Sequence, residues 1–404
     1  MADEGQKQED PWQFVTVDQY RAPPEIVDVG SVKRSFLSVV RRIAGTAPSE
    51  SSPLDPEEDL HVLTGEQLDR AVPAPDWVEG AAALQERLRP WLEAERPSKP
   101  VVFYVAPPHA GRNELLAQWA RHADIAVVEE ATEDQILSVD GGWFRSWPKA
   151  DRWLLPRLER CFLREAEGLD LVRELLAQML SGELGRGVIG CDSWAWTFLQ
   201  HVWLGRPSFT ICAQAFDAAR LKDLFSRGFG GETGAAPDLR QADTGAYLLS
   251  EQSDETHRRS TNAFWRRLAA RSRGNPGVAI AYWRRALRTL PEREIEDNES
   301  EERRLRRETI WVTPWEDLGQ PAMPGEAGET ASFVLHALLL HDGLRIDRLA
   351  AILPSDRTAI TEALLFLAEA DLVTCEGEYW QVTAYGYPVV RSALMANDYL
   401  CDPF

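Results

Sequence analysis

Short apolar runs alternate with helical patterns between residues 101 and 290. The runs are rich in β-branched and aromatic residues, as buried strands are, and the segments between them carry apolar residues at helical spacing. The predicted strands are Val101–Val105, Ala126–Val128, Val188–Cys191 and Ser208–Cys212. The predicted helices are Glu114–Arg121, Arg152–Leu163, Leu169–Leu180, Phe216–Phe225 and Ser260–Leu290, the last broken at Gly274–Gly277. This alternation predicts an α/β fold with a parallel sheet flanked by helices.

A different pattern occupies residues 331–396. The predicted helices here are Ser332–Leu340, Arg345–Leu353, a third from Ser355 or Asp356 to Ala370, and a closing helix Tyr387–Met395. Two short strands flank the turn Glu376-Gly377-Glu378, between the third and the closing helix. Three helices followed by a β-hairpin is the order of a winged helix.

Five segments follow from these patterns and from the stretches between them. Residues 1–97 are expected to form an irregular leader, with helical patterns only at Ser31–Ile43 and Asp76–Leu92. The α/β domain is expected at 98–250, a helical segment at 251–295, a charged linker at 296–330 and the winged helix at 331–404. The stretch 291–330 contains 12 acidic and 5 basic residues and ends in a turn-rich sequence, which is typical of a linker or an extended arm.

Composition narrows the functional classes. The net charge of −20 argues against general attraction to nucleic acid or to an anionic membrane. The 5 cysteines show no CxxC spacing, so neither a disulfide framework nor a zinc cluster is expected. The polar start MADEGQKQED does not resemble a secretory signal, and no apolar run approaches the roughly 18–20 residues that span a bilayer. We therefore expect a cytoplasmic protein without membrane insertion.

The strand Val101–Val105 leads through a turn into a helix, which is the context of a phosphate-binding loop. Such a loop needs G-x-x-x-x-G-K-[ST], so that backbone N–H groups surround the phosphates, a Lys reaches them and a hydroxyl holds Mg²⁺. The aligned residues are Ala106, Pro107, Pro108, His109, Ala110, Gly111, Arg112 and Asn113. Only the second glycine is kept. Arg112 keeps the positive charge but not the compact ammonium group, and Asn113 has no hydroxyl.

A second feature is the apolar strand that ends at Asp192. An acid at this place supports Mg²⁺ in P-loop proteins, and a neighbouring glutamate often orients the attacking water. The neighbour here is Ser193, which cannot act as a carboxylate base. The alternative for Asp192 is a purely structural carboxylate that caps the following helix.

Three further positions have both a functional and a structural interpretation. Gln214 follows the strand Ser208–Cys212 as a polar strand-end residue. Gly274, Asn275 and Pro276 interrupt a helix that resumes at once, either as a functional motif or as an ordinary helix–turn–helix break. His109 lies inside the loop, where a lone histidine is more often a solvated side chain than a catalytic one.

The order of these features resembles that of P-loop ATPases of the AAA+ and STAND group, over residues 97–290 and 331–396. The resemblance implies a P-loop NTPase-like sheet, a helical lid and a C-terminal winged helix. It places Ala106–Asn113 at the Walker A loop, Asp192 at the Walker B acid, Gln214 near the sensor and Gly274-Asn275-Pro276 at the lid motif. The implied cofactor is ATP or ADP with Mg²⁺, although the eroded loop is also compatible with no cofactor.

The charge distribution bears on partners. Nine arginines and no acid occur from Arg258 to Arg288, and they face either phosphates, the acidic stretch 291–302 or an acidic neighbouring subunit. Residues 331–404 carry ten acids against four arginines, a net charge of −6, and the third helix and the hairpin turn are acidic. A DNA-reading winged helix should be basic, so we expect protein contacts or self-association here.

Three hypotheses remain open on the sequence. The first is a regulatory or scaffold protein with a degenerate Walker A loop, a pseudo-ATPase that works through protein contacts or self-assembly. The second is an active, divergent ATPase in which Arg112 replaces the lysine and Asp192 holds Mg²⁺. The third is a nucleic-acid-binding regulator that uses the arginine-rich helices and the winged helix.

Overall fold

The computed structural model describes most of the chain as two compact units. The described residues are 11–24, 60–72, 74–138, 142–203, 209–228, 238–249, 255–289, 309–315, 317–325 and 328–404. Unit 1 contains Met1–Ala22, Trp77–Ala215 and Pro321–Phe404, and unit 2 contains Pro23–Asp76 and Phe216–Gln320.

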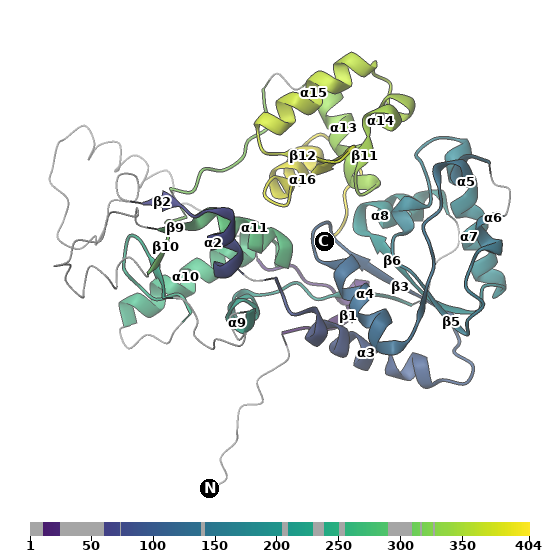
Figure 1. Ribbon diagram of the computed structural model, residues 1–404, viewed down its shortest axis with the longest axis horizontal. Helices are drawn as coiled ribbons and strands as arrows, with labels where there is room; N and C mark the ends of the chain where they lie inside the picture. The colour runs from purple at the N-terminus through teal and green to yellow at the C-terminus, as the bar shows by residue number, and fades with distance from the viewer. Residues whose placement is uncertain are drawn as a thin grey trace, which may run out of the picture. The chain divides into compact units, whose positions relative to one another are not determined.

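Unit 1 is built on a six-stranded sheet with the order β1-β7-β3-β6-β5-β4 (Figure 1). The strands are β1 (Phe14–Thr16), β3 (Val101–Ala106), β4 (Ala126–Val127), β5 (Arg152–Leu155), β6 (Arg186–Asp192) and β7 (Thr210–Ala213). Strands β3 to β7 are parallel, and β1 pairs antiparallel with β7. The first parallel strand lies between the fourth and the fifth. The predicted α/β fold with a mainly parallel sheet is confirmed.

Helices cover both faces of this sheet. They are α3 (Trp77–Glu93), α4 (Arg112–Ala123), α5 (Glu133–Ser138), α6 (Gly142–Arg145), α7 (Asp170–Ser181) and α8 (Ser193–Val202), with 3₁₀ turns η1 (Val17–Gln19), η2 (Leu158–Arg160) and η3 (Glu167–Leu169). Successive strand residues point to opposite faces. Phe103 packs on Trp196 of α8, with ring centroids 4.8 Å apart. Its neighbour Tyr104 pairs with Gly190, whose missing side chain leaves room for Leu116 of α4.

The predicted helix Arg152–Leu163 is wrong. Residues Arg152–Leu155 form strand β5, parallel to both β4 and β6, and a 3₁₀ turn follows at Leu158–Arg160. Trp153, Leu154 and Leu155 are all buried. A parallel strand that is covered on both faces has no alternation of apolar and polar residues, so its short apolar run is easily taken for part of a helix.

The expected leader, 1–97, contributes ordered elements to the sheet domain. Strand β1 extends the sheet at β7, with Phe14 opposite Ala213. The predicted helix Asp76–Leu92 is present as α3, whose buried residues Leu84 and Leu88 are fully enclosed. The predicted helix Ser31–Ile43 lies outside the described residues.

Unit 2 contains a four-stranded sheet with the order β2-β9-β10-β8. Its strands are β2 (His61–Val62), β8 (Leu239–Gln241), β9 (Leu287–Thr289) and β10 (Ile310–Val312), and its helices are α2 (Gly65–Ala71), α9 (Ala218–Gly228), α10 (Glu255–Arg271) and α11 (Pro276–Ala286). Strand β10 is paired on both sides, although it lies in the expected linker 296–330. The predicted helix Ser260–Leu290 ends earlier, because the chain turns into β9 at Leu287.

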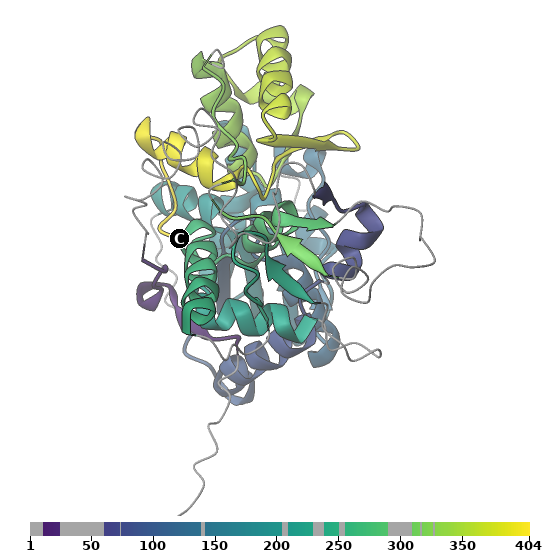
Figure 2. The same cartoon turned by 90° about the vertical axis from the view of Figure 1, so that its left-hand side faces the viewer.

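Residues 328–404, which we name the C-terminal module, belong to unit 1. The elements are α13 (Gly328–Leu340), β11 (Leu344–Arg345), α14 (Ile346–Ile352), α15 (Arg357–Glu369), β12 (Val373–Glu376), β13 (Tyr379–Val382) and α16 (Tyr387–Ala396). The strands form a three-stranded sheet in the order β11-β13-β12, drawn in yellow and yellow-green in Figure 2. Three helices and a hairpin occur in the predicted order, consistent with a winged domain.

In the described part of the chain, every helix is too short or too polar to cross a lipid bilayer.

Candidate functional site

The loop that follows β3 and the acid that ends β6 meet at the carboxyl ends of these two central strands. Strands β3 and β6 are neighbours in parallel register, with Ala106 opposite Asp192. After β3 the chain crosses to β4 on one side of this strand pair, and after β6 it crosses to β7 on the other side. Neighbouring strands whose connections leave in opposite directions form a topological switch point. The carboxyl ends of such strands are the usual ligand position of α/β proteins. The structure therefore brings together the residues 106–113 and Asp192, which the sequence singled out separately.

Gly111 has the left-handed backbone conformation that the loop needs to enter α4. Its φ is 75°, and it is the N-cap residue of the helix. A Cβ atom added here would overlap the indole ring of Trp77 in α3. Ala110 N–H donates to the carbonyl oxygen of Pro107 at 3.2 Å, which closes the turn on itself. The glycine thus makes room for an indole of the same protein.

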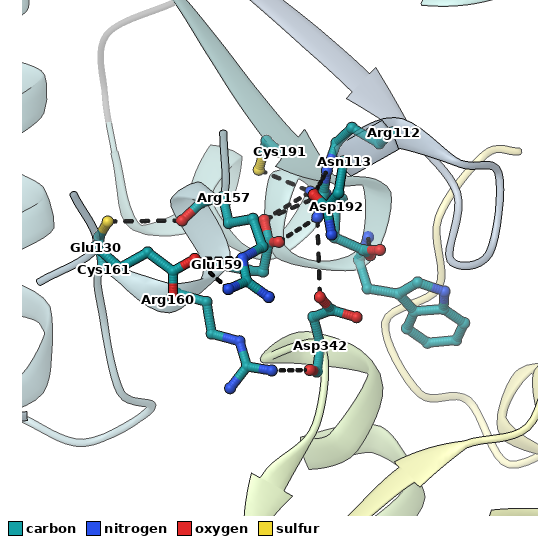
Figure 3. A network of polar contacts seen from close by, with 11 residues as sticks. Arg112, Asn113, Glu130, Arg157, Glu159, Arg160, Cys161, Cys191, Asp192 and Asp342 are labelled. Atoms are coloured by element: carbon teal, nitrogen blue, oxygen red, sulfur yellow. Dashed lines mark hydrogen bonds and ion pairs between the residues drawn. The ribbon is translucent and has the colours of Figure 1, made fainter. Parts of the chain in front are cut away.

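Arg112 points toward Glu159 rather than along the loop (Figure 3). Nη1 donates to Oε2 at 3.3 Å, and Nη2 donates to Oε1. Oε2 also accepts the backbone N–H of Asp192 at 3.0 Å. Both partners are buried, with side-chain exposures of 6% and 0%. The guanidinium of Arg112 is therefore paired inside the protein.

The C-terminal module supplies a second carboxylate to this arginine. Oδ2 of Asp342 lies 3.9 Å from Nη2 of Arg112, and the carbonyl oxygen of Asp342 accepts a hydrogen bond from Arg160 (Figure 3). Burial alone would lower the pKa of Arg112, but the nearby carboxylates, that of Glu159 first, raise it above its usual value. Arg112 stays charged, and its charge is balanced by acids before any ligand arrives.

Asp192 caps helix α8. Its Oδ1 accepts the backbone N–H of Trp194 at 2.9 Å, and the residue is only 3% exposed. Burial raises the pKa of this carboxyl group well above its ordinary value, against the attraction of Arg112. The cap accounts for the carboxylate at this position on structural grounds.

Ser193, the first residue of α8, contacts Asp402 near the end of the chain. Its hydroxyl donates to Oδ2 of Asp402, whose Oδ1 accepts from Nε of Arg391 at 3.2 Å. The next residue, Trp194, donates through Nε1 to the hydroxyl of Tyr387 at 3.1 Å. These buried bonds attach the C-terminal module to the start of α8.

His109 is not a freely solvated side chain, contrary to expectation. Its φ is 65°, its ring lies edge-on to that of Tyr387 at a centroid distance of 6.0 Å, and its Nε2 is buried without a hydrogen-bond partner among the described residues. Burial lowers its pKa below the usual value. A cavity of about 20 Å³ lies between His109, Asp192 and Asp342, which is room for about one water molecule.

Gln214 lies at the end of β7, and its side chain binds the N-terminal segment. Oε1 accepts the backbone N–H of Arg21 at 3.2 Å, and Nε2 donates to the carbonyl oxygen of the same residue. The amide thus holds the peptide that follows β1.

Gly274, Asn275 and Pro276 lie in unit 2 and form a compact helix junction. Gly274 has φ 71°, the side chain of Asn275 accepts from the backbone N–H groups of Gly277 and Val278 at 3.1 and 3.3 Å, and Pro276 begins α11. Each residue has its preferred place in a helix stop and restart. This geometry is explained without a ligand.

The residues at the switch point do not fit a nucleotide with Mg²⁺. Phosphates would need a cation free to turn toward them, and the metal would need an accessible carboxylate and a hydroxyl. Arg112 is paired with Glu159, Asp192 caps α8, and Asn113 offers an amide. The space in front of them is closed by the C-terminal module down to about 20 Å³.

The sequence analysis did not identify three acids that matter here: Glu159, Asp342 and Asp402. Glu159 follows β5, so its place beside Asp192 was hidden by the mistaken helix. A correct strand assignment would have put it at the same sheet edge. Asp342 and Asp402 come from a distant part of the chain, and no local pattern marks them.

No protein-family model matches the chain, and a comparison with curated proteins finds no match. Among solved structures, a RuvB variant from Thermotoga maritima matches at 14% identity and TM-score 0.31, covering 87% of this chain and 99% of its own. The Walker-type ATPase paby2304 of Pyrococcus abyssi matches at 13% and 0.30, covering 80% and 96%. Cdc6p from Pyrobaculum aerophilum matches at 11% and 0.25, covering 87% and 97%. At these identities and TM-scores the matches assign neither a family nor a function to this chain. The α/β fold is established by the order and pairing of its own strands.

Proposed function

We propose that this chain is a regulatory or scaffold protein on an AAA+/STAND-like P-loop fold, with a nucleotide position that no longer serves hydrolysis. It acts in the cytoplasm through contacts with another protein or with copies of itself. The observation that carries the proposal is the buried contact of Arg112 with Glu159, which Asp342 of the C-terminal module approaches from the other side.

Electrostatics at the switch point opposes a polyphosphate. Arg112 is surrounded by the carboxyl groups of Glu159, Asp192 and Asp342. A phosphate that recruited this arginine would leave Glu159 buried without its partner, and breaking a buried pair costs roughly 3–5 kcal/mol. The binding energy of the phosphate would have to exceed this cost.

The outer face of α15 supports a protein partner. Leu365 and Phe366 are 55% and 42% exposed, and Glu362 and Glu369 lie exposed on the same helix. A DNA-reading helix would present basic side chains to phosphates at this place. Adjacent exposed apolar side chains instead suit a protein surface.

Arginines of α10 and α11 contact acidic side chains of this same chain. Arg259 contacts Glu255 at 3.1 Å within α10, and Arg284 contacts Asp69 of α2 at 2.8 Å. These contacts support the internal, protein-facing interpretation of the arginine-rich stretch.

Titration of the full chain with ATP and Mg²⁺ tests the proposal, together with a phosphate-release assay. We expect neither saturable binding nor turnover above buffer. Turnover that Asp192→Asn abolishes would establish the divergent ATPase instead. A gel shift at low salt, where electrostatic binding is strongest, tests the nucleic-acid hypothesis, for which we expect no shifted band.

A further inference from the structure

A second, larger cavity lies within unit 1 beside the sheet edge. Its volume is about 90 Å³, and its walls come from the 3₁₀ turn η2, helix α5 and the C-terminal module. A water molecule needs about 10–15 Å³ by this measure, so the cavity has room for several water molecules or one small polyatomic ligand. It is distinct from the 20 Å³ space in front of the loop. The two cavities come nearest at adjoining residues, because His341 lines the larger one and Asp342 lines the smaller one.

Three residues of the cavity wall carry buried polar atoms without hydrogen-bond partners in the described part of the chain. They are Nε of Arg160, Nε of Arg348 and both ring nitrogens of His341. His341 is only 1% exposed. An unpaired buried polar group costs about 1–3 kcal/mol, so three such residues around one cavity indicate a site built for a polar occupant.

The unpaired groups define what the occupant must offer. The two Nε–H groups and the single N–H of a neutral imidazole are donors, so they require acceptor oxygens. The two nitrogens of one imidazole point in opposite directions, so a small occupant meets only one of them. Burial lowers the pKa of His341 to about 3, against the effect of the Glu159 backbone carbonyl, so the ring is neutral and offers one N–H.

Charge selects an anion. The guanidinium of Arg160 is held by the Asp342 carbonyl oxygen and lies over the ring of Tyr379 at 5.1 Å, and neither contact neutralises its charge. The other charged residues of the wall, Glu130, Glu133, Glu159, Arg345 and Arg348, all take part in ion pairs.

We propose that this cavity binds a small tetrahedral oxyanion, either inorganic phosphate or the phosphoryl group of a small monoester. Its oxygens accept from Nε of Arg160, Nε of Arg348 and the ring N–H of His341. Because η2 and the C-terminal module share the cavity wall, the bound anion stabilises their contact. This inference does not depend on the proposed function.

Calorimetric titration of the full chain with inorganic phosphate, sulfate and glycerol phosphate at equal ionic strength tests the inference. Sulfate has the same shape and offers the same acceptor oxygens, so we expect saturable binding of both phosphate and sulfate. Glycerol phosphate that binds as well as phosphate assigns the site to monoesters, and its failure assigns it to the free anion.

Variants locate the site. Arg160→Gln should weaken phosphate binding at least tenfold, and His341→Phe, which keeps a ring but has no N–H, should weaken it as well. Arg173→Gln removes an exposed arginine of α7 that pairs with Asp170, and should change nothing. The inference is overturned by no saturable binding of either anion (a cavity that holds water only), or by binding that Asn113→Ala removes while Arg160→Gln does not.

Discussion

Arg112 at the start of α4 makes a two-pronged contact with Glu159, which follows β5. Oε2 of Glu159 accepts from Arg112 Nη1 at 3.3 Å and from the backbone N–H of Asp192 at 3.0 Å. One carboxylate thus joins the carboxyl ends of three neighbouring strands. Arg112 thus holds together the carboxyl ends of β3, β5 and β6.

Removing the arginine should destabilise the fold. Arg112→Ala leaves the carboxylate of Glu159 buried without its cation, and we expect the free energy of unfolding to fall by roughly 3–5 kcal/mol. Urea unfolding followed by circular dichroism measures it. The paired variant Arg112→Met with Glu159→Leu removes both charges and should recover most of the loss. A single variant as stable as the wild type would contradict the contact.

Gly111→Ala should be destabilising for two separable reasons. The left-handed backbone disfavours alanine, and the new methyl group overlaps Trp77. We expect a fall of about 2–4 kcal/mol, the range of an overpacked site with backbone strain. Adding Trp77→Ala relieves the overlap, so the second step from Gly to Ala should cost only about 1 kcal/mol in that background. Equal costs in both backgrounds would place the indole elsewhere.

Asn275→Ala removes the cap of α11. The loss of two backbone hydrogen bonds from Gly277 and Val278 should lower the free energy of unfolding by about 1 kcal/mol, within the usual range for caps. Asn262 is exposed on α10 and provides a matched control, whose change to Ala should stay within about 0.5 kcal/mol. Equal effects at the two positions would argue against the cap.

His341 should make folding less favourable in acid. Its pKa falls to about 3 in the folded chain from about 6.5 in the unfolded one, so below pH 6.5 the unfolded state binds a proton that the folded state does not. This contribution weakens folding by up to about 1.4 kcal/mol for each pH unit between 6.5 and 3. His341→Phe lacks it, so its stability relative to the wild type should rise as the pH falls from 7 to 5. Parallel profiles of the two proteins would refute a neutral, buried ring.

Much of the fold could be predicted from local patterns. The strand Val101–Val105, the helix after it and the closing helices of the C-terminal module appear where the spacing of apolar residues placed them. The prediction for residues 152–163 was wrong because a fully buried parallel strand has no alternation of apolar and polar residues to distinguish it from a helix. Strand β10 was not predicted because a run of three residues is too short to stand out within a highly charged segment.

The candidate site was predictable only in part. The sequence identified the loop and Asp192, because both follow apolar strands and carry a recognisable spacing. It could not reveal which side chains contact them. Glu159, Trp77 and Asp342 reach Arg112 and Gly111 through tertiary packing, and no pattern within a single segment encodes such contacts.

The most direct test of the central claim is calorimetric titration of ATP with Mg²⁺ into the wild-type chain and into Glu159→Gln. We expect no saturable heat with the wild type, because Arg112 is already paired, and at most weak binding when the competing charge of Glu159 is removed. Tight, saturable binding to the wild type, with phosphate release that Asp192→Asn abolishes, would contradict it.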